Sequence, residues 1–191
     1  MVTGLLTRKK TRRSKKGLPN SGRIRARIAW LSYIRIILPR GAEGAGVGVI
    51  NEYFLASSDA AAADVLDTGP TNAVIGPDPG SELASLEAIL LGLDPVSDEA
   101  VSLVSRDDHA VDVAHHDDYS CMVVKIASGT TQLIASATLD ELRPHLQRWA
   151  RTEDFAGTTD ADLHEMMTAL HPLFVSAASD PGQALYVWIS L

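Results

Sequence analysis

The sequence predicts one α+β domain over residues 47–191, with a small mixed sheet, helices packed mainly on one face of the sheet, and a basic N-terminal extension before the domain. The first observation behind this prediction is the charge: of the 17 Lys and Arg, 12 lie in residues 1–40, which hold none of the 24 Asp and Glu. The second is that helical and strand-like periods both occur after residue 47. A segment of about 150 residues is ordinary for a single domain with one core.

The last third of the chain begins with the clearest helix signal. Thr138 and Glu141 form a capping-box motif, which predicts a helix from about Leu139 to about Ala150. Apolar residues at spacings of three and four, ending at Trp149, give this helix one apolar face.

A second helix and a final strand are predicted after that. Thr159 or Asp160 caps the helix, and Pro172 is expected to kink or restart it because a proline ring clashes with the preceding turn. Asp180-Pro-Gly182 is a turn signal, and residues 184–191 then form a strand. Both sets of alternating side chains in this strand are mostly apolar, which predicts a strand covered on both faces.

Shorter elements are predicted between residues 49 and 137. Strands are expected at 49–55, near 111–113 and at 119–126, and helices at 59–66, at 81–91 with Ser81 as the cap, and at 97–104. Residues 131–137 fit either the return strand of a hairpin through Ser128-Gly129 or a short helix.

Several short motifs follow one another from residue 47 onward. They are Glu52-Tyr53-Phe54, Asp59-Ala-Ala-Ala62, Leu86-Glu87-Ala-Ile-Leu90 with Gly92, Trp149 with Thr152-Glu153-x-Phe155-x-Gly157, Leu163 and Leu170, and Gly182 with Leu185-Tyr-Val-Trp188. In this combination the chain resembles an uncharacterised family of small actinobacterial proteins. The resemblance supports the predicted fold and implies no activity. Asp154 and Ala156 stand where that family pattern has a second Glu and a Trp, so a paired-carboxylate site is not implied.

The resemblance directs attention to Glu153 and Glu87 as candidate catalytic residues. A Glu beside Trp149 and Phe155 is expected to have a raised pKa, which suits an acid or base. The alternative is that Glu153 only caps a turn or a helix end. Two further rings, those of Tyr53 and Trp188, join Trp149 as candidate binding residues, and the alternative for all three is packing in the core.

No metal site and no cofactor is predicted. His109, His115 and His116 lie among aspartates, but adjacent residues of a strand point to opposite faces, so His115 and His116 cannot share one metal there. The single cysteine, Cys121, excludes a disulfide within the chain and favours the cytoplasm. A lone cysteine in a strand is more often a small buried apolar residue than a nucleophile.

Residues 1–46 carry the basic extension. Residues 1–22 are too polar to build a core and are predicted to be disordered, whereas residues 23–38 fit a short basic amphipathic helix. This apolar run is too short to cross a bilayer, and no transmembrane segment is predicted. Three hypotheses stay open: the extension binds nucleic acid or an anionic surface, it is a targeting segment, or it is not part of the natural protein and translation starts at Val47 or Val49.

The function expected from these observations is a non-enzymatic cytoplasmic module that binds or regulates a protein partner. One alternative is a small hydrolase or transferase that uses Glu153 or Glu87. Another is a nucleic-acid binder that works through residues 1–40, where the positive charge is concentrated.

Overall fold

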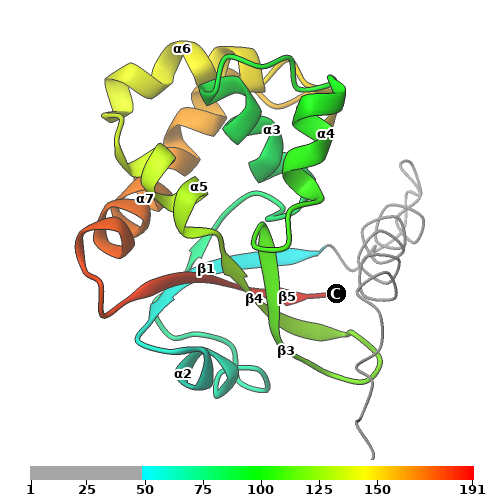
Figure 1. Cartoon of the computed structure of the whole chain (residues 1–191), viewed down its shortest axis with the longest axis vertical. Helices are drawn as coiled ribbons and strands as arrows, with labels where there is room; N and C mark the ends of the chain where they lie inside the picture. Colours follow the sequence, from blue (N-terminus) through cyan, green and yellow to red (C-terminus); the bar gives the residue numbers. More distant parts are fainter. Residues whose placement is uncertain (1–48) are drawn as a thin grey trace, which may run out of the picture. The chain divides into compact units, whose positions relative to one another are not determined.

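The computed structural model describes residues 49–191, which form one mixed α and β domain (Figure 1). The predicted basic helix at 23–38 lies outside the described residues. The elements are β1 (Ile50–Ala56), α2 (Asp59–Ala63), β2 (Val74–Ile75), α3 (Ser81–Leu90), α4 (Asp98–Val104), β3 (Ala110–His115), β4 (Cys121–Ile126), α5 (Ser128–Ala135), α6 (Leu139–Trp149), the short 3-10 helix η1 (Glu153–Phe155), α7 (Asp160–Ser179) and β5 (Ala184–Ser190). The predicted α+β class is confirmed.

The strands form one sheet in the order β2-β1-β5-β4-β3. Every pairing in it is antiparallel, so the expectation of a mixed sheet was wrong about strand direction. The last strand of the chain, β5, lies in the middle and pairs with β1 along its whole length and with β4 on the other side. Periodicity reports which face a side chain takes, but it does not report which strand lies next to which.

Helices cover the two faces of the sheet unequally, as expected. The short helix α2 lies against one face, and α3 to α7 lie on the other side, with α7 directly on β1, β2 and β5 (Figure 1). Alternation along β1 and β5 serves both layers. Tyr53 pairs with Val187 beneath α7, and Phe54 pairs with Tyr186 beneath α2. All four side chains are at most 5% exposed, so the prediction of a last strand covered on both faces is confirmed.

The long helices follow their sequence signals. Thr138 and Glu141 form the predicted capping box, and Thr159 forms a second one with Asp162 at the start of α7. Helix α7 buries four side chains spaced by four, three and four residues, namely Leu163, Met167, Leu170 and Phe174. It continues through Pro172 instead of restarting there.

Local predictions were less accurate where the signal was short. Residues 128–135 form helix α5, so the helical alternative was right and the hairpin through Ser128-Gly129 was wrong. The helix from Asp59 ends at Ala63 and gives way to turns. The two-residue strand β2 was not predicted, because two residues have no period. Ser81 is the first residue of α3 and not its cap.

Candidate functional site

Three side chains from different parts of the fold bind the turn that leads into α3. The hydroxyl of Tyr53, on β1, donates to the carbonyl of Pro77 at 2.9 Å. The indole nitrogen of Trp149, at the end of α6, donates to the carbonyl of Glu82 at 3.0 Å. The Nε2 of His109, just before β3, donates to the carbonyl of Gly80 at 2.9 Å. The start of α3 is therefore where two of the predicted binding residues meet.

Two carboxyl groups bind backbone N–H groups at the start of α3 and in the turn before it. Asp78 accepts from the backbone N–H groups of Gly80 and Ser81 at 2.9 and 2.7 Å, and Glu82 accepts from the N–H of Asp78 at 2.7 Å. These bonds satisfy N–H groups that would otherwise lack partners at the N-terminus of α3. Sequence analysis missed this pair; the signal was an Asp four residues before a Glu at the start of a helix.

Burial raises the pKa values of the carboxyl groups at this helix end. Burial raises the pKa of Glu82 to about 7, with smaller contributions from the charges of Asp78 and Asp154. Burial also raises the pKa of Asp78, although its hydrogen bonds to Ser81 and Gly80 act in the opposite direction. The pKa of Tyr53 is raised for the same first reason. Glu82 is thus a carboxyl group that can bind a proton near neutral pH.

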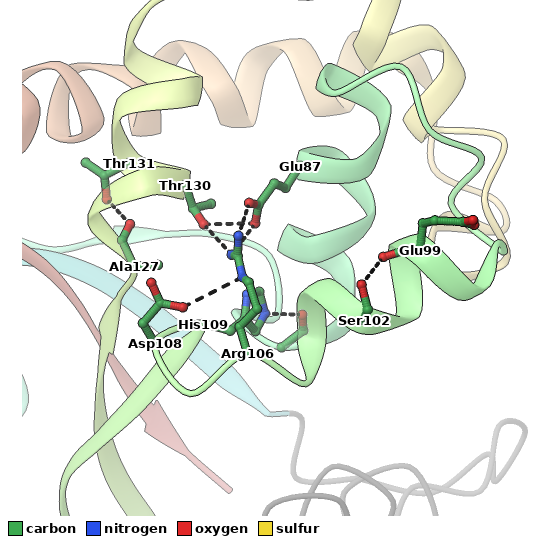
Figure 2. Close-up of polar contacts among 10 residues, drawn as sticks. Glu87, Glu99, Ser102, Arg106, Asp108, His109, Ala127, Thr130 and Thr131 are labelled. Atoms are coloured by element: carbon green, nitrogen blue, oxygen red, sulfur yellow. Dashed lines mark hydrogen bonds and ion pairs between the residues drawn. The ribbon is translucent and has the colours of Figure 1, made fainter.

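Glu87, a predicted catalytic residue, is held in a closed network on the next turns of α3 (Figure 2). Its two carboxylate oxygens accept from the guanidinium of Arg106 at 2.8 and 2.9 Å, and the hydroxyl of Thr130 donates to it at 2.8 Å. The Glu87 side chain is 3% exposed, whereas that of Arg106 is 33% exposed. A carboxylate with these bonds links α3, α5 and the segment before β3.

Glu153 and Trp149, which are near each other in sequence, have different environments. Trp149 is fully buried, and the ring of Phe155 meets it edge-on at 4.5 Å between centroids. Glu153 is exposed on η1, while its neighbour Asp154 is half-buried and contributes its charge to Glu82. The turn after α6 therefore brings Asp154 into electrostatic contact with α3.

Trp188 lies apart from the other candidates. Its ring is half-buried in the layer formed by α2, and its indole nitrogen donates to the carbonyl of Leu66 at 2.9 Å. Tyr53 and Trp149 lie on the α7 side of the sheet, so the structure brings these two candidates together with Glu87 around α3 and leaves Trp188 on the opposite face.

An exposed apolar surface lies beside the buried network. Leu91 is 50% exposed, Val96 83% and Val101 57%; we name these three residues the α3–α4 surface. Ser97 caps α4 by accepting from the N–H of Ala100, so Val96 precedes the cap and Val101 is the fourth helical residue. Side chains at these two positions commonly pack on each other. Here both remain exposed, so two apolar side chains at the start of α4 are open to solvent.

The α3–α4 surface is fixed to the rest of the domain at its base. The guanidinium of Arg148, on α6, donates to the carbonyl of Leu93 at 2.8 Å. Ala100 packs inward at 4% exposure, and α4 contacts α3. The surface is thus a formed part of the domain, and sequence analysis missed it because a valine after Asp94-Pro95 gives no periodic signal.

Within residues 49–191 there is no group of three or more His, Cys, Asp and Glu side chains that could hold a metal ion. The Nδ1 of His115 lies 2.9 Å from a carboxylate oxygen of Asp112, whereas the Nε2 of His116 lies 2.7 Å from one of Asp67. The two neighbouring histidines therefore turn to different partners.

Comparison with known proteins finds no matching family model, no similar curated protein and no similar solved structure. The resemblance to an actinobacterial family therefore stays a prediction. In the described part of the chain, none of the helices combines the length and the apolar character that a membrane crossing requires.

Proposed function

We propose that residues 49–191 form a non-enzymatic module that binds a protein partner in the cytoplasm through the α3–α4 surface. The observation that carries the proposal is the 83% exposure of Val96 between two other exposed apolar side chains, on a segment that Arg148 and Ala100 hold in place. Apolar side chains gathered on an ordered surface favour association, because covering them removes apolar area from water.

The environment of the predicted catalytic residues supports a binding role over an enzymatic one. A general acid or base has to come within hydrogen-bonding distance of its substrate. Glu87 is 3% exposed and already bonded to Arg106 and Thr130. Its arrangement is typical of a residue that holds helices together.

Photo-crosslinking from position 96 tests the proposal. A partner captured there would be purified and titrated against the wild-type chain and against Val96→Asp. We expect the substitution to weaken binding by about tenfold or more, which is about 1.4 kcal/mol. Val175→Asp is the matched control, since Val175 is a 38% exposed valine on α7. Equal affinity of the wild type and Val96→Asp would contradict the proposal. So would a partner that is captured from a photo-crosslinker at position 175 and not from one at position 96.

The enzymatic alternative, a hydrolase or transferase, is better supported at Glu82 than at Glu87 or Glu153. A carboxyl group with a pKa of about 7 is suited to proton transfer at neutral pH. A screen of hydrolase and transferase substrates would compare Glu82→Gln with Glu153→Gln. Activity lost in the first variant and kept in the second would favour this alternative, and activity kept in both would remove Glu82 from consideration.

A further inference from the structure

Resting on the proposed function, we infer that the partner segment bound by the α3–α4 surface is a cationic amphipathic one, with Lys or Arg beside apolar side chains. The surface combines an apolar centre with acidic surroundings, and the two features together select this chemistry.

The apolar centre consists of three exposed side chains. Val96 and Val101 occupy neighbouring positions at the first turn of α4, and Leu91 ends the preceding helix. All three are at least half exposed. A partner that places a leucine or a similar side chain between them gains about 25 cal/mol for each square ångström of apolar surface covered.

The charged residues of the segment that carries this surface are all acidic. Asp94, Asp98 and Glu99 are all exposed, and residues 91–105 contain no Lys, Arg or His. Arg106 follows and is bonded to Glu87, while Arg148 reaches the Leu93 carbonyl at the α3 end. Asp98 and Glu99 also suit the positive end of the α4 dipole, which is their structural role. Their negative potential still acts on a ligand that approaches Val96 and Val101.

This charge distribution distinguishes between classes of partner. Nucleic acids and anionic lipid surfaces are repelled by exposed carboxylates, because both carry negative charge. A second copy of the same surface would place like charges opposite each other, which opposes self-association through it. A peptide segment with both apolar and basic side chains satisfies the centre and its surroundings together.

Synthetic peptides of about 18 residues, the length of a five-turn amphipathic helix, test the inference. A Leu/Lys peptide and a Leu/Glu peptide with the same apolar pattern would be titrated against the full chain. Residues 1–40 carry 12 basic residues and can attract the Leu/Glu peptide by charge alone. The deciding quantity is therefore the change in affinity that a substitution on the α3–α4 surface causes.

Two substitutions separate the apolar and charged contributions. We expect Asp98→Asn with Glu99→Gln to weaken Leu/Lys binding about tenfold and to flatten its salt dependence. Val96→Ser should weaken it with little change in salt dependence. The matched controls are Asp140→Asn, an exposed first-turn residue of α6, and Val175→Ser, and neither should change the affinity.

The outcomes separate the inference from the proposed function. Unchanged Leu/Lys affinity in the Asp98→Asn, Glu99→Gln protein overturns the cationic partner, while a crosslinked partner that depends on Val96 still leaves the binding module standing. Unchanged affinity of Val96→Ser for the peptide also overturns the inference. A partner whose affinity does not depend on Val96 overturns the proposed function instead. Sedimentation that shows dimers lost in Val96→Ser would identify a second copy as the occupant and overturn the inference.

Discussion

At the scale of single residues, close contacts fix the position of the turn before α3. A Cβ atom added at Gly76 would lie 2.6 Å from the Cε2 of Tyr53 and 3.1 Å from the Cδ2 of Leu170. Tyr53 is fully buried, and its hydroxyl is bonded to the Pro77 carbonyl. The ring therefore cannot move aside without breaking a buried hydrogen bond. Glycine is required here by space.

We expect Gly76→Ala to lower the free energy of unfolding by about 1–3 kcal/mol, the usual cost of overpacking. Gly129→Ala is the control, because a Cβ at Gly129 in α5 meets no atom within 4 Å. That substitution should be neutral or stabilise by up to about 1 kcal/mol through helix propensity. Urea unfolding measures both variants. Equal stability of the two would show that the contact with Tyr53 relaxes at no cost.

At the scale of elements, two carboxyl groups hold helix α3, one at its start and one in its middle. Glu82 binds the N–H of Asp78 in the turn before the helix, and Glu87 joins the middle of the helix to Arg106 and α5. The two carboxyl groups differ in what they contribute. Glu82 has a raised pKa through burial near Asp78, whereas Glu87 has a cation as its direct partner. They lead to separate predictions.

The pH dependence of stability should change when Glu82 is replaced by Gln. Folding raises the pKa of Glu82 from 4.5 to about 7, so the unfolded chain loses this proton first as the pH rises. The contribution of protonated Glu82 to the free energy of unfolding is full below pH 4.5 and is lost by about pH 7. With allowance for solvent screening of a half-buried group, Glu82→Gln should be about 1–2 kcal/mol more stable than the wild type at pH 8, because each pKa unit is about 1.4 kcal/mol.

The same two proteins should have similar stability at pH 4, where Glu82 is protonated in both states. His109 acts in the opposite direction, since burial lowers its pKa and its contribution is lost as the pH falls below 6.5. The difference between wild type and Glu82→Gln cancels that effect. Thermal unfolding from pH 4 to 8 measures the stability difference between the wild type and Glu82→Gln. A difference that does not depend on pH would refute the raised pKa of Glu82.

Breaking the ion pair of Glu87 should be costly. Arg106→Gln leaves a 3% exposed carboxylate with Thr130 as its remaining bonded partner from the network, and removal of one partner of a buried pair costs about 3 kcal/mol or more. Lys125→Gln is the control, because Lys125 and Asp59 form a pair at 2.8 Å that is 37% and 59% exposed. An exposed pair contributes about 0–1 kcal/mol. Similar losses in both variants would mean that burial of Glu87 does not matter.

At the scale of the whole molecule, the domain that follows the basic segment should fold without it. The described residues have a core of their own, with fully buried side chains such as Tyr53 under α7 and Tyr186 under α2. We therefore expect the chain without residues 1–46 to unfold cooperatively, with a melting temperature close to that of the full chain. A large decrease in melting temperature would place residues before 47 in the core.

The same pair of proteins tests the nucleic-acid alternative. Full-length protein should bind DNA or anionic vesicles with an affinity that falls steeply with salt, because 12 basic residues lie in residues 1–40. The shortened protein, which keeps 5 basic residues against the acidic ones, should bind neither. Equal binding by both proteins in a salt titration would show that the basic segment is not responsible.

The sequence alone determined the features that depend on local spacing. The capping box at Thr138, a helix start at Thr159 or Asp160, the two helices and the doubly covered strand β5 were all predictable, because cap motifs and periods of 3.6 or 2 are local signals. The start of helix α4 at Ser97-Asp98-Glu99 was predictable from its residue types, which are typical of a helix start. The antiparallel strand order and the two-residue strand β2 were not, because neither leaves a period in the sequence.

The candidate sites depended on tertiary structure. Glu87 looks like any helical glutamate until Arg106, 19 residues later, and Thr130, 43 residues later, are brought to it and bury its charge. The raised pKa of Glu82 comes from burial and from Asp154 after α6. Val96 is exposed because no other segment of the described residues packs over it. Sequence spacing sets which face a residue takes, whereas burial and pairing are set by segments far apart in the chain, and those decide what each side chain can do.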